Sequence, residues 1–235
     1  MTEPPEQLVL DLGHRAALGA EDFLVSQSNA AAVAVVDRWP DWPHFAVVLV
    51  GPAQSGKTHL ADVWRLKSGA HARAAADIAE ADVPGLMAAR ALLVENLETG
   101  VGDERALFYL LNLVREHKMS MLLTTQRAPG ELEVALPDLR SRLRALPLVA
   151  IEAPDDALLK AVLVKHCADR QLVVEPHVIN HIALHMDRSM QAAAEIVAEI
   201  DLRALATKRR VTRALAGEVM QIRRHRDHAT DEAHS

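Results

Sequence analysis

The chain has 235 residues, of which 50% are hydrophobic and only 3% aromatic, and its net charge is −6. This length allows one α/β domain with a small appended unit, and the core must be built mainly from aliphatic side chains. The negative charge argues against a protein that coats nucleic acid through a broad basic surface. The single cysteine, Cys167, excludes an intramolecular disulfide, and no apolar stretch approaches the roughly 20 residues that span a bilayer. We therefore expect a cytoplasmic protein with no membrane partner, and a buried, small apolar role for Cys167.

The predicted elements begin after an acidic leader that contains two prolines. An Ala/Val-rich helix is expected at roughly 29–38, and short apolar strands then alternate with helices, which is typical of a parallel sheet covered on both faces. The expected strands are 45–50, 71–75, 91–94, 120–124 and 148–151, and the expected helices are the one that follows the first strand, 103–117 and 137–143.

After Pro154 the pattern becomes helical throughout. Asp155 and Ser189 are plausible N-caps, and Pro176 suits a first helical turn. The expected helices are 155–170, 175–187, 189–206 and 211–223. The sequence therefore predicts a leader over 1–19, an α/β unit over 20–153, a small all-helical lid over 154–223 and a polar tail over 224–235.

A complete phosphate-binding loop, Gly-Pro-Ala-Gln-Ser-Gly-Lys-Thr, occupies 51–58 between the first strand and its helix. In this setting the backbone N–H groups of the loop and the helix N-terminus converge on phosphates. Lys57 can reach the terminal phosphates and Thr58 can hold Mg²⁺. The chain is therefore predicted to bind a nucleoside triphosphate or diphosphate, and the residues expected to bind it are Gly51, Pro52, Gln54, Ser55, Gly56, Lys57, Thr58 and His59.

An acidic residue, Glu95, follows the apolar run 91–94 at the C-terminal end of a predicted strand, where ligands bind in such sheets. We expect Glu95 to support Mg²⁺, although a surface carboxylate after a buried strand gives the same pattern. The next residue is Asn96, which can hydrogen-bond a water molecule but cannot accept its proton. Intrinsic ATP hydrolysis should therefore be slow or absent.

Two further features are candidates for sensing or stabilising a terminal phosphate. Thr124 and Thr125 end another predicted strand, where they could either sense the phosphate or simply cap the strand. Arg142, in the helix 137–143, could project from the surface into a neighbouring subunit and stabilise charge on a γ-phosphate. An ordinary solvated arginine is the alternative.

These features occur in the order found in an AAA+ ATPase, and the details resemble the ATPase domain of the bacterial replication initiator DnaA. The similarity spans roughly 20–220 and includes 20–29, 93–97 and 137–143. In that family the segment matching 20–29 lies against the adenine, which implies that Phe23 and Val25 contact the base. The initiator's DNA-binding domain has no counterpart after Met220, so no direct sequence-specific DNA binding is expected.

The segment Gln7–Leu12 looks like the sliding-clamp-binding motif of replication proteins. An extended backbone would put Leu8, Leu10 and Leu12 on one face, while Gln7 offers an amide for anchoring. An edge strand of the protein's own sheet would show the same alternation.

A clamp motif joined to a lone initiator-type domain resembles the Hda family of regulatory inactivators of DnaA. That resemblance implies ADP or ATP with Mg²⁺ as ligands, and DnaA and the DNA polymerase III sliding clamp (its beta subunit) as partners, at the replisome. It also implies that Arg142 acts in trans on the ATP of DnaA and so restrains re-initiation. The sequence leaves open two other functions, an autonomous ATPase or loader and a nucleotide-gated adaptor that does not stimulate hydrolysis. It also leaves open whether the chain forms a homo-oligomer.

Other positions stay unassigned at this point. The family's lid arginine should fall near 188–191, where Arg188 and Gln191 both occur. His177, His181 and His185 are four residues apart and share a helix face, which more often is a solvated face than a zinc site.

Overall fold

The computed structural model describes residues 24–207 and 209–232, with side chains as far as Arg223. The predicted clamp motif, 7–12, and Phe23 lie outside the described residues. The chain divides into two compact units, with the boundary between Ala153 and Pro154. In the described ranges no helix is both long enough and apolar enough to cross a membrane.

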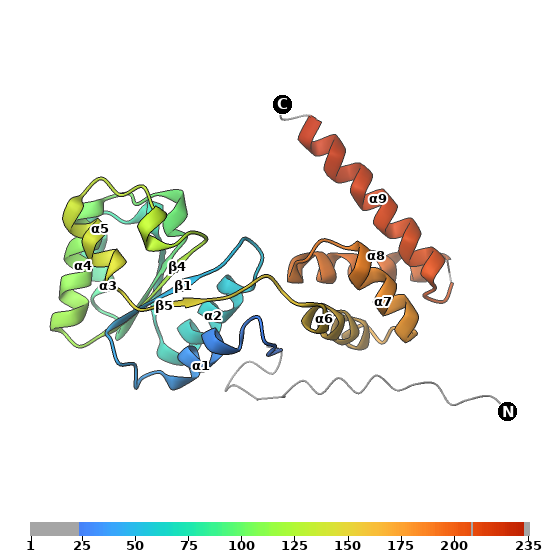
Figure 1. Ribbon diagram of the computed structural model, residues 1–235, viewed down its shortest axis with the longest axis horizontal. Helices are drawn as coiled ribbons and strands as arrows, with labels where there is room; N and C mark the ends of the chain where they lie inside the picture. Colours follow the sequence, from blue (N-terminus) through green and yellow to red (C-terminus); the bar gives the residue numbers. More distant parts are fainter. Residues whose placement is uncertain (1–23, 208, 233–235) are drawn as a thin grey trace. The chain divides into compact units, whose positions relative to one another are not determined.

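The first unit is built on a five-stranded parallel sheet with the strand order β2-β3-β4-β1-β5 (Figure 1). Strands β1, β3 and β4 are almost entirely buried, whereas the edge strands β2 and β5 are partly exposed. The buried strands therefore read as continuous apolar runs. The predicted fold class, a parallel α/β sheet followed by helices, is confirmed. The strands are β1 (Ala46–Val50), β2 (His71–Ala74), β3 (Ala91–Glu95), β4 (Ser120–Thr125) and β5 (Leu148–Ala150).

One face of the sheet is covered by α1 (Ala30–Arg38) and α2 (Lys57–Ser68) (Figure 1). Side chains alternate along a strand, so Leu49 of β1 points to this face and joins a core with the fully buried Trp64 of α2. Trp64 stacks on Trp42 with the ring centroids 5.4 Å apart. Because α2 starts directly from the loop after β1, this packing fixes the position of its N-terminus.

The opposite face is covered by α3 (Val83–Leu86), α4 (Glu104–Glu116) and α5 (Pro137–Arg144). Asp103 caps α4, because its carboxylate accepts hydrogen bonds from two backbone N–H groups of the first turn. Helical spacing places a buried apolar stripe of α4 against the sheet, and this stripe consists of Leu107, Leu110, Leu111 and Val114.

The second unit is all-helical. Asp155 accepts a hydrogen bond from the N–H of Leu158 at 2.7 Å, and Ser189 accepts one from the N–H of Ala192 at 3.0 Å, so both expected N-caps are made. The helices of this unit are α6 (Asp156–Asp169), α7 (Pro176–His185), α8 (Met190–Thr207) and α9 (Arg213–Glu232).

Two local features differ from the sequence expectations. Helix α3 and the 3₁₀ turns of the first unit were not expected, because they are too short to show an apolar period. Helix α9 continues to Glu232, through most of the range 224–235 that was expected to be a polar tail. Charged residues such as arginine and glutamate are good helix formers, so polarity alone does not end a helix.

Candidate functional site

The phosphate loop joins the C-terminal end of β1 to the N-terminus of α2, as its motif predicts. Gln54 and Gly56 have left-handed backbones, with φ angles of 61° and 99°. Glycine suits the second of these because it has no Cβ to oppose that conformation. Gly51 is required for space instead, since a Cβ there would lie 2.4 Å from the carbonyl oxygen of Ile151 and 2.9 Å from Ser55 Oγ. The loop geometry thus depends on both motif glycines.

Lys57, the first residue of α2, is buried, with 7% of its surface exposed. Its Nζ donates hydrogen bonds to the carbonyl oxygens of Gly51 and Pro52, both at 2.7 Å. Burial lowers the pKa of Lys57, and the negative charge of Glu98 partly opposes this effect. Ser55 Oγ is also buried and has no hydrogen-bond partner in the described part of the chain. A buried cation and an unpartnered hydroxyl at a helix N-terminus fit the oxygens of a phosphate group.

The two residues predicted to support Mg²⁺ lie at the same edge of the sheet. Glu95 ends β3, and Thr58 lies in the first turn of α2. Burial raises the pKa of Glu95, the carboxylate of Asp62 raises it further, and Arg65 lowers it. Asp62 lies one turn after Thr58 on the same helix face. A cation would relieve the repulsion between the two carboxylates, so the donor set fits a hard metal ion such as Mg²⁺.

The end of β4 is tied to the residue that follows β3. Asn96 has a left-handed backbone, with φ of 58°, which asparagine tolerates better than most residues. Its N–H donates to Thr124 Oγ1 at 3.1 Å. The hydroxyl of Thr125 donates to the carbonyl of Arg127 at 2.9 Å and accepts from its N–H at 3.2 Å. Phosphate sensing by these threonines stays a prediction, and Thr124 is the better candidate because its hydroxyl proton is left to donate.

Sequence reasoning missed Glu98, which lies in the 3₁₀ turn Leu97–Thr99. Its Oε2 accepts a hydrogen bond from the N–H of Gln126 at 3.1 Å, and its Oε1 is buried without a partner among the described residues. Gln126 directly follows β4, and β4 lies between β1 and β3. The Glu98 carboxylate therefore lies at the end of β4, the strand between the phosphate loop and Glu95. In the sequence, Glu98 is a second acid three residues after Glu95. A solvated loop glutamate gives the same pattern, so the sequence alone does not distinguish it.

The segment expected against the base is held in shape by Asn29, which sequence reasoning also missed. Asn29 Oδ1 accepts from the N–H of Ser26 at 2.9 Å, and its Nδ2 donates to the carbonyl of Leu24 at 3.0 Å. Asn29 and Ser28 are both buried. Val25, one of the two residues predicted to contact the base, is half-buried and packs against the core beneath α1 and α2.

Arg142 on α5 does not project freely into solvent, in contrast to the expectation. It is half-buried, its Nη2 donates to Asn112 Oδ1 at 3.2 Å, and its guanidinium lies 5.8 Å from the centre of the Phe108 ring. The start of α5 is positioned by Glu104, whose carboxylate accepts two backbone N–H groups from the segment before Pro137. The contacts with α4 explain the difference, because sequence spacing within α5 does not report them. A finger role in trans stays a prediction.

In the helical unit, both candidates for a lid sensor make contacts within that unit. Arg188 donates to Asp156 Oδ1 at 2.5 Å and to the carbonyl of Pro154 at 2.9 Å. Gln191 donates to Glu195 Oε1 at 2.7 Å. The sensor role therefore stays unassigned.

The three histidines of α7 lie along a largely exposed helix face. His177 and His185 are exposed and His181 is half-buried, and the rings of His181 and His185 are 4.5 Å apart. Within the described ranges no three His, Cys, Asp or Glu side chains form a group that could hold a metal. Cys167 on α6 is buried, with 4% of its surface exposed, as expected for a small apolar role.

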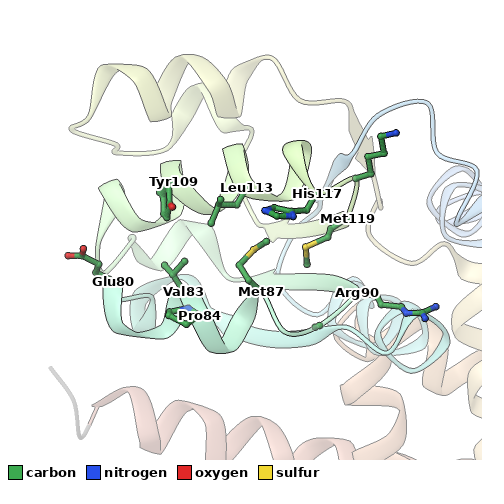
Figure 2. A pocket seen from close by; sticks show the side chains of 11 residues that line it. Glu80, Val83, Pro84, Met87, Arg90, Tyr109, Leu113, His117 and Met119 are labelled. Atoms are coloured by element: carbon green, nitrogen blue, oxygen red, sulfur yellow. The ribbon is translucent and has the colours of Figure 1, made fainter.

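A separate hollow of about 800 Å³ lies between α3 and α4 (Figure 2). Met87, Leu113 and Met119 are among its apolar lining residues, and the cationic residues Arg90 and Lys118 also line it. Its lining contains no residue of the phosphate loop, so it is not part of the candidate nucleotide site.

No protein-family model matches the chain. Domain III of the replication initiation protein DnaA from Thermotoga maritima is similar, with a TM-score of 0.70 and 16% identity over 86% of this chain and 94% of that one. AMPPCP-bound DnaA from Aquifex aeolicus has a TM-score of 0.71 and 21% identity, over 88% and 69% of the two chains. The Holliday junction branch migration motor RuvB from Thermotoga maritima has a TM-score of 0.64 and 17% identity, over 83% and 66%. The chain thus has the AAA+ P-loop fold of DnaA and RuvB.

Proposed function

We propose that this chain is a DnaA-related AAA+ regulator that retains a nucleotide and acts through partner proteins. The observation that carries the proposal is a complete phosphate site in which Asn96, not an acid, follows Glu95. The buried Lys57 and the unpartnered hydroxyl of Ser55 support nucleotide binding. The amide of Asn96 cannot take a proton from an attacking water, so turnover by the chain alone is slow or absent.

The ligand proposed for this site is ADP or ATP with Mg²⁺. DnaA structures of the same fold contain AMPPCP, an ATP analogue, which supports an adenine nucleotide. The backbone N–H groups of the loop would surround the phosphates, and Lys57 would neutralise part of their charge. Thr58 and Glu95 would hold the metal ion, whose chemistry is to neutralise negative charge on the phosphate oxygens.

The catalytic contribution of the chain is proposed to be Arg142, acting on the ATP of DnaA. Releasing Arg142 from Asn112 and Phe108 costs about 1–2 kcal/mol, which is the usual worth of one hydrogen bond and one exposed cation–π contact. An arginine finger accelerates phosphoryl transfer by roughly 10³–10⁵-fold, or about 4–7 kcal/mol. The gain at a partner's γ-phosphate exceeds the cost of release, so the observed position is compatible with this role.

Recruitment is proposed to occur through Gln7–Leu12, which would bind the sliding clamp. The alternation of Leu8, Leu10 and Leu12 suits an extended peptide in an apolar groove. So short a contact is weak alone, and a ring-shaped clamp with repeated sites would strengthen it through avidity. Stimulated hydrolysis would leave DnaA in its ADP form and restrain re-initiation.

The test is ATP hydrolysis by DnaA in the presence of DNA-loaded clamp, with the wild-type chain, Arg142→Ala and Arg140→Ala. Arg140 is an exposed arginine of the same helix, so it is a matched control. We expect Arg142→Ala to lose the stimulation and Arg140→Ala to keep it. Equal stimulation by all three proteins would refute the finger role. Hydrolysis by the chain without any partner would favour an autonomous ATPase instead.

A further inference from the structure

The hollow between α3 and α4 is an apolar surface that is open to solvent (Figure 2). Met87, Leu113 and Met119 are half-buried in its lining, and Tyr109 on the α4 side is 54% exposed. An enclosed pocket for a small molecule would leave less of such a ring in water. Methionine side chains adapt to irregular partners, so the lining fits a docked segment of protein.

The end of α4 places a lysine beside this surface. The N–H of Lys118 donates to the carbonyl of Arg115 at 3.3 Å, and the N–H of Met119 donates to the carbonyl of Val114 at 2.9 Å. Lys118 has a left-handed backbone, with φ of 53°. These features define a Schellman ending, in which glycine is the usual residue at the position of Lys118. The chain therefore keeps a cation where glycine would be more favourable for the fold.

A second cation, Arg90, lies at the same end of the sheet. Strands β3 and β4 are parallel neighbours in which Ala91 pairs with Ser120. Arg90 comes one residue before Ala91 and Lys118 comes two residues before Ser120, so both lie at the N-terminal ends of these strands. Both are exposed, and within the described ranges neither has a carboxylate at ion-pair distance. The hollow therefore combines an apolar lining with two unpaired positive charges.

We propose that this hollow docks an amphipathic helix of a partner protein, with apolar side chains in the hollow and carboxylates beside Arg90 and Lys118. Charge complementarity sets the orientation, because Glu80 precedes α3 whereas Arg90 follows it, and Figure 2 shows them at opposite ends of the hollow. A single-stranded nucleic acid fits less well. Its phosphates gain nothing from the methionines, and both Glu80 and the net charge of −6 repel them.

This surface is separate from the candidate nucleotide site. The phosphate loop follows β1 and Glu95 ends β3, so that site lies at the C-terminal ends of the strands, whereas Arg90 and Lys118 precede β3 and β4. Docking in the hollow therefore goes beyond the nucleotide-binding function, and either one can fail without the other.

The probe is a fluorescein-labelled peptide of about 15 residues, long enough to form a helix, with leucine at i, i+3, i+4 and i+7 and glutamate near one end. Fluorescence anisotropy measures its binding to the full chain. Two matched peptides carry lysine in place of glutamate, or serine in place of leucine. The chain variants are Arg90→Ala, Lys118→Gly and Tyr109→Ser. The control is Arg115→Ala, because Arg115 is an exposed arginine of α4 that does not line the hollow.

Lys118→Gly separates docking from folding. Glycine adopts the left-handed backbone at this position without strain, so the Tm of this variant should rise by roughly 2–4 °C. A loss of peptide binding in a more stable protein cannot come from unfolding.

We expect Arg90→Ala and Lys118→Gly each to weaken binding by about twofold to fivefold, the usual worth of one exposed ion pair. Tyr109→Ser should weaken it by about tenfold, and Arg115→Ala should leave it unchanged. Both matched peptides should bind at least about tenfold more weakly. In ¹³C-methyl NMR spectra the acidic peptide should shift the methyl signals of Met87 and Met119, but not that of Met186 in the helical unit.

Three results would overturn the proposal. The first is an affinity for the acidic peptide that is unmeasurable, or that is the same in the wild type and the three hollow variants. The second is binding of a 20-nucleotide oligodeoxythymidine, weakened by Lys118→Gly, in place of the peptide, which would make the surface a nucleic-acid site. The third is a dimer in sedimentation that Tyr109→Ser dissociates, which would make the occupant a second copy of the chain.

Discussion

Gly51, the first glycine of the phosphate loop, is a direct test of how that loop is built. A Cβ at this position would lie 2.4 Å from the carbonyl oxygen of Ile151 and 2.9 Å from Ser55 Oγ. Ile151 cannot retreat easily, because its N–H donates to the carbonyl of Val50 at 2.7 Å and so ties the end of β5 to β1. We expect Gly51→Ala to lower the free energy of unfolding by about 1–3 kcal/mol, as overpacking does. Each kcal/mol corresponds to roughly 2–4 °C in Tm for a chain of this size.

Thermal unfolding followed by circular dichroism measures this effect, with Gly85→Ala as the control. Gly85 lies in the same unit, and a Cβ there meets no atom within 4 Å. That substitution should be neutral or stabilising by up to about 1 kcal/mol, because alanine restricts the unfolded chain. Nucleotide affinity should fall in Gly51→Ala alone, since the displaced loop no longer directs its N–H groups at one phosphate. Equal Tm values for the two variants would refute the close approach as the reason for this glycine.

Three further predictions concern the site and the two cores. Asn96→Asp supplies a proton acceptor after Glu95, and a positioned base contributes roughly 10²–10⁴-fold to a rate. The rate of ATP hydrolysis, measured as phosphate release, should therefore rise by at least about tenfold. An unchanged rate would show that another step limits turnover. Leu111 is fully buried, so Leu111→Ala should lower the free energy of unfolding, measured by urea denaturation, by about 2–5 kcal/mol. Leu66 is 71% exposed, so Leu66→Ala should change the same quantity by less than about 0.5 kcal/mol. Burial raises the pKa of Cys167 to about 11, above its unfolded value, so its contribution to stability is complete below about pH 8.5 and is lost as the pH rises toward 11. Cys167→Ala should therefore lose less stability than the wild type over that range in urea titrations, and an identical loss would contradict the assigned burial.

Features that depend on neighbouring residues could be predicted from the sequence. The strands β1, β3 and β4 are buried on both faces, so they appear as uninterrupted apolar runs and were placed to within one residue. The caps Asp155 and Ser189 act on N–H groups three residues away, so spacing alone indicates them. The phosphate loop is equally local, because the left-handed conformation at Gly56 suits a glycine that the motif specifies.

Features that depend on contacts between distant segments could not be predicted in this way. Arg142 was expected to face outward, but α4 passes beside α5 and provides Asn112 and Phe108 as partners. Glu98 was not recognised because its position depends on β4 lying between β1 and β3, which the order of strands along the chain does not state. Sequence reasoning located the phosphate loop, which a single segment carries, and the binding roles of its residues stay predictions. It failed where the strand order brings them together.

Asn96 shows how the local and the distant requirements combine. The backbone after β3 must be left-handed for its N–H to reach Thr124 and for the next turn to bring Glu98 over β4. Asparagine and aspartate both tolerate this conformation, so the backbone would accept an acid at this position. The acid is instead two residues later, at Glu98, whose Oε2 accepts the N–H of Gln126. The amide of Asn96 leaves no proton acceptor directly after Glu95, the residue proposed to support the metal. Under the proposed function, a site of this kind binds a nucleotide without turning it over rapidly.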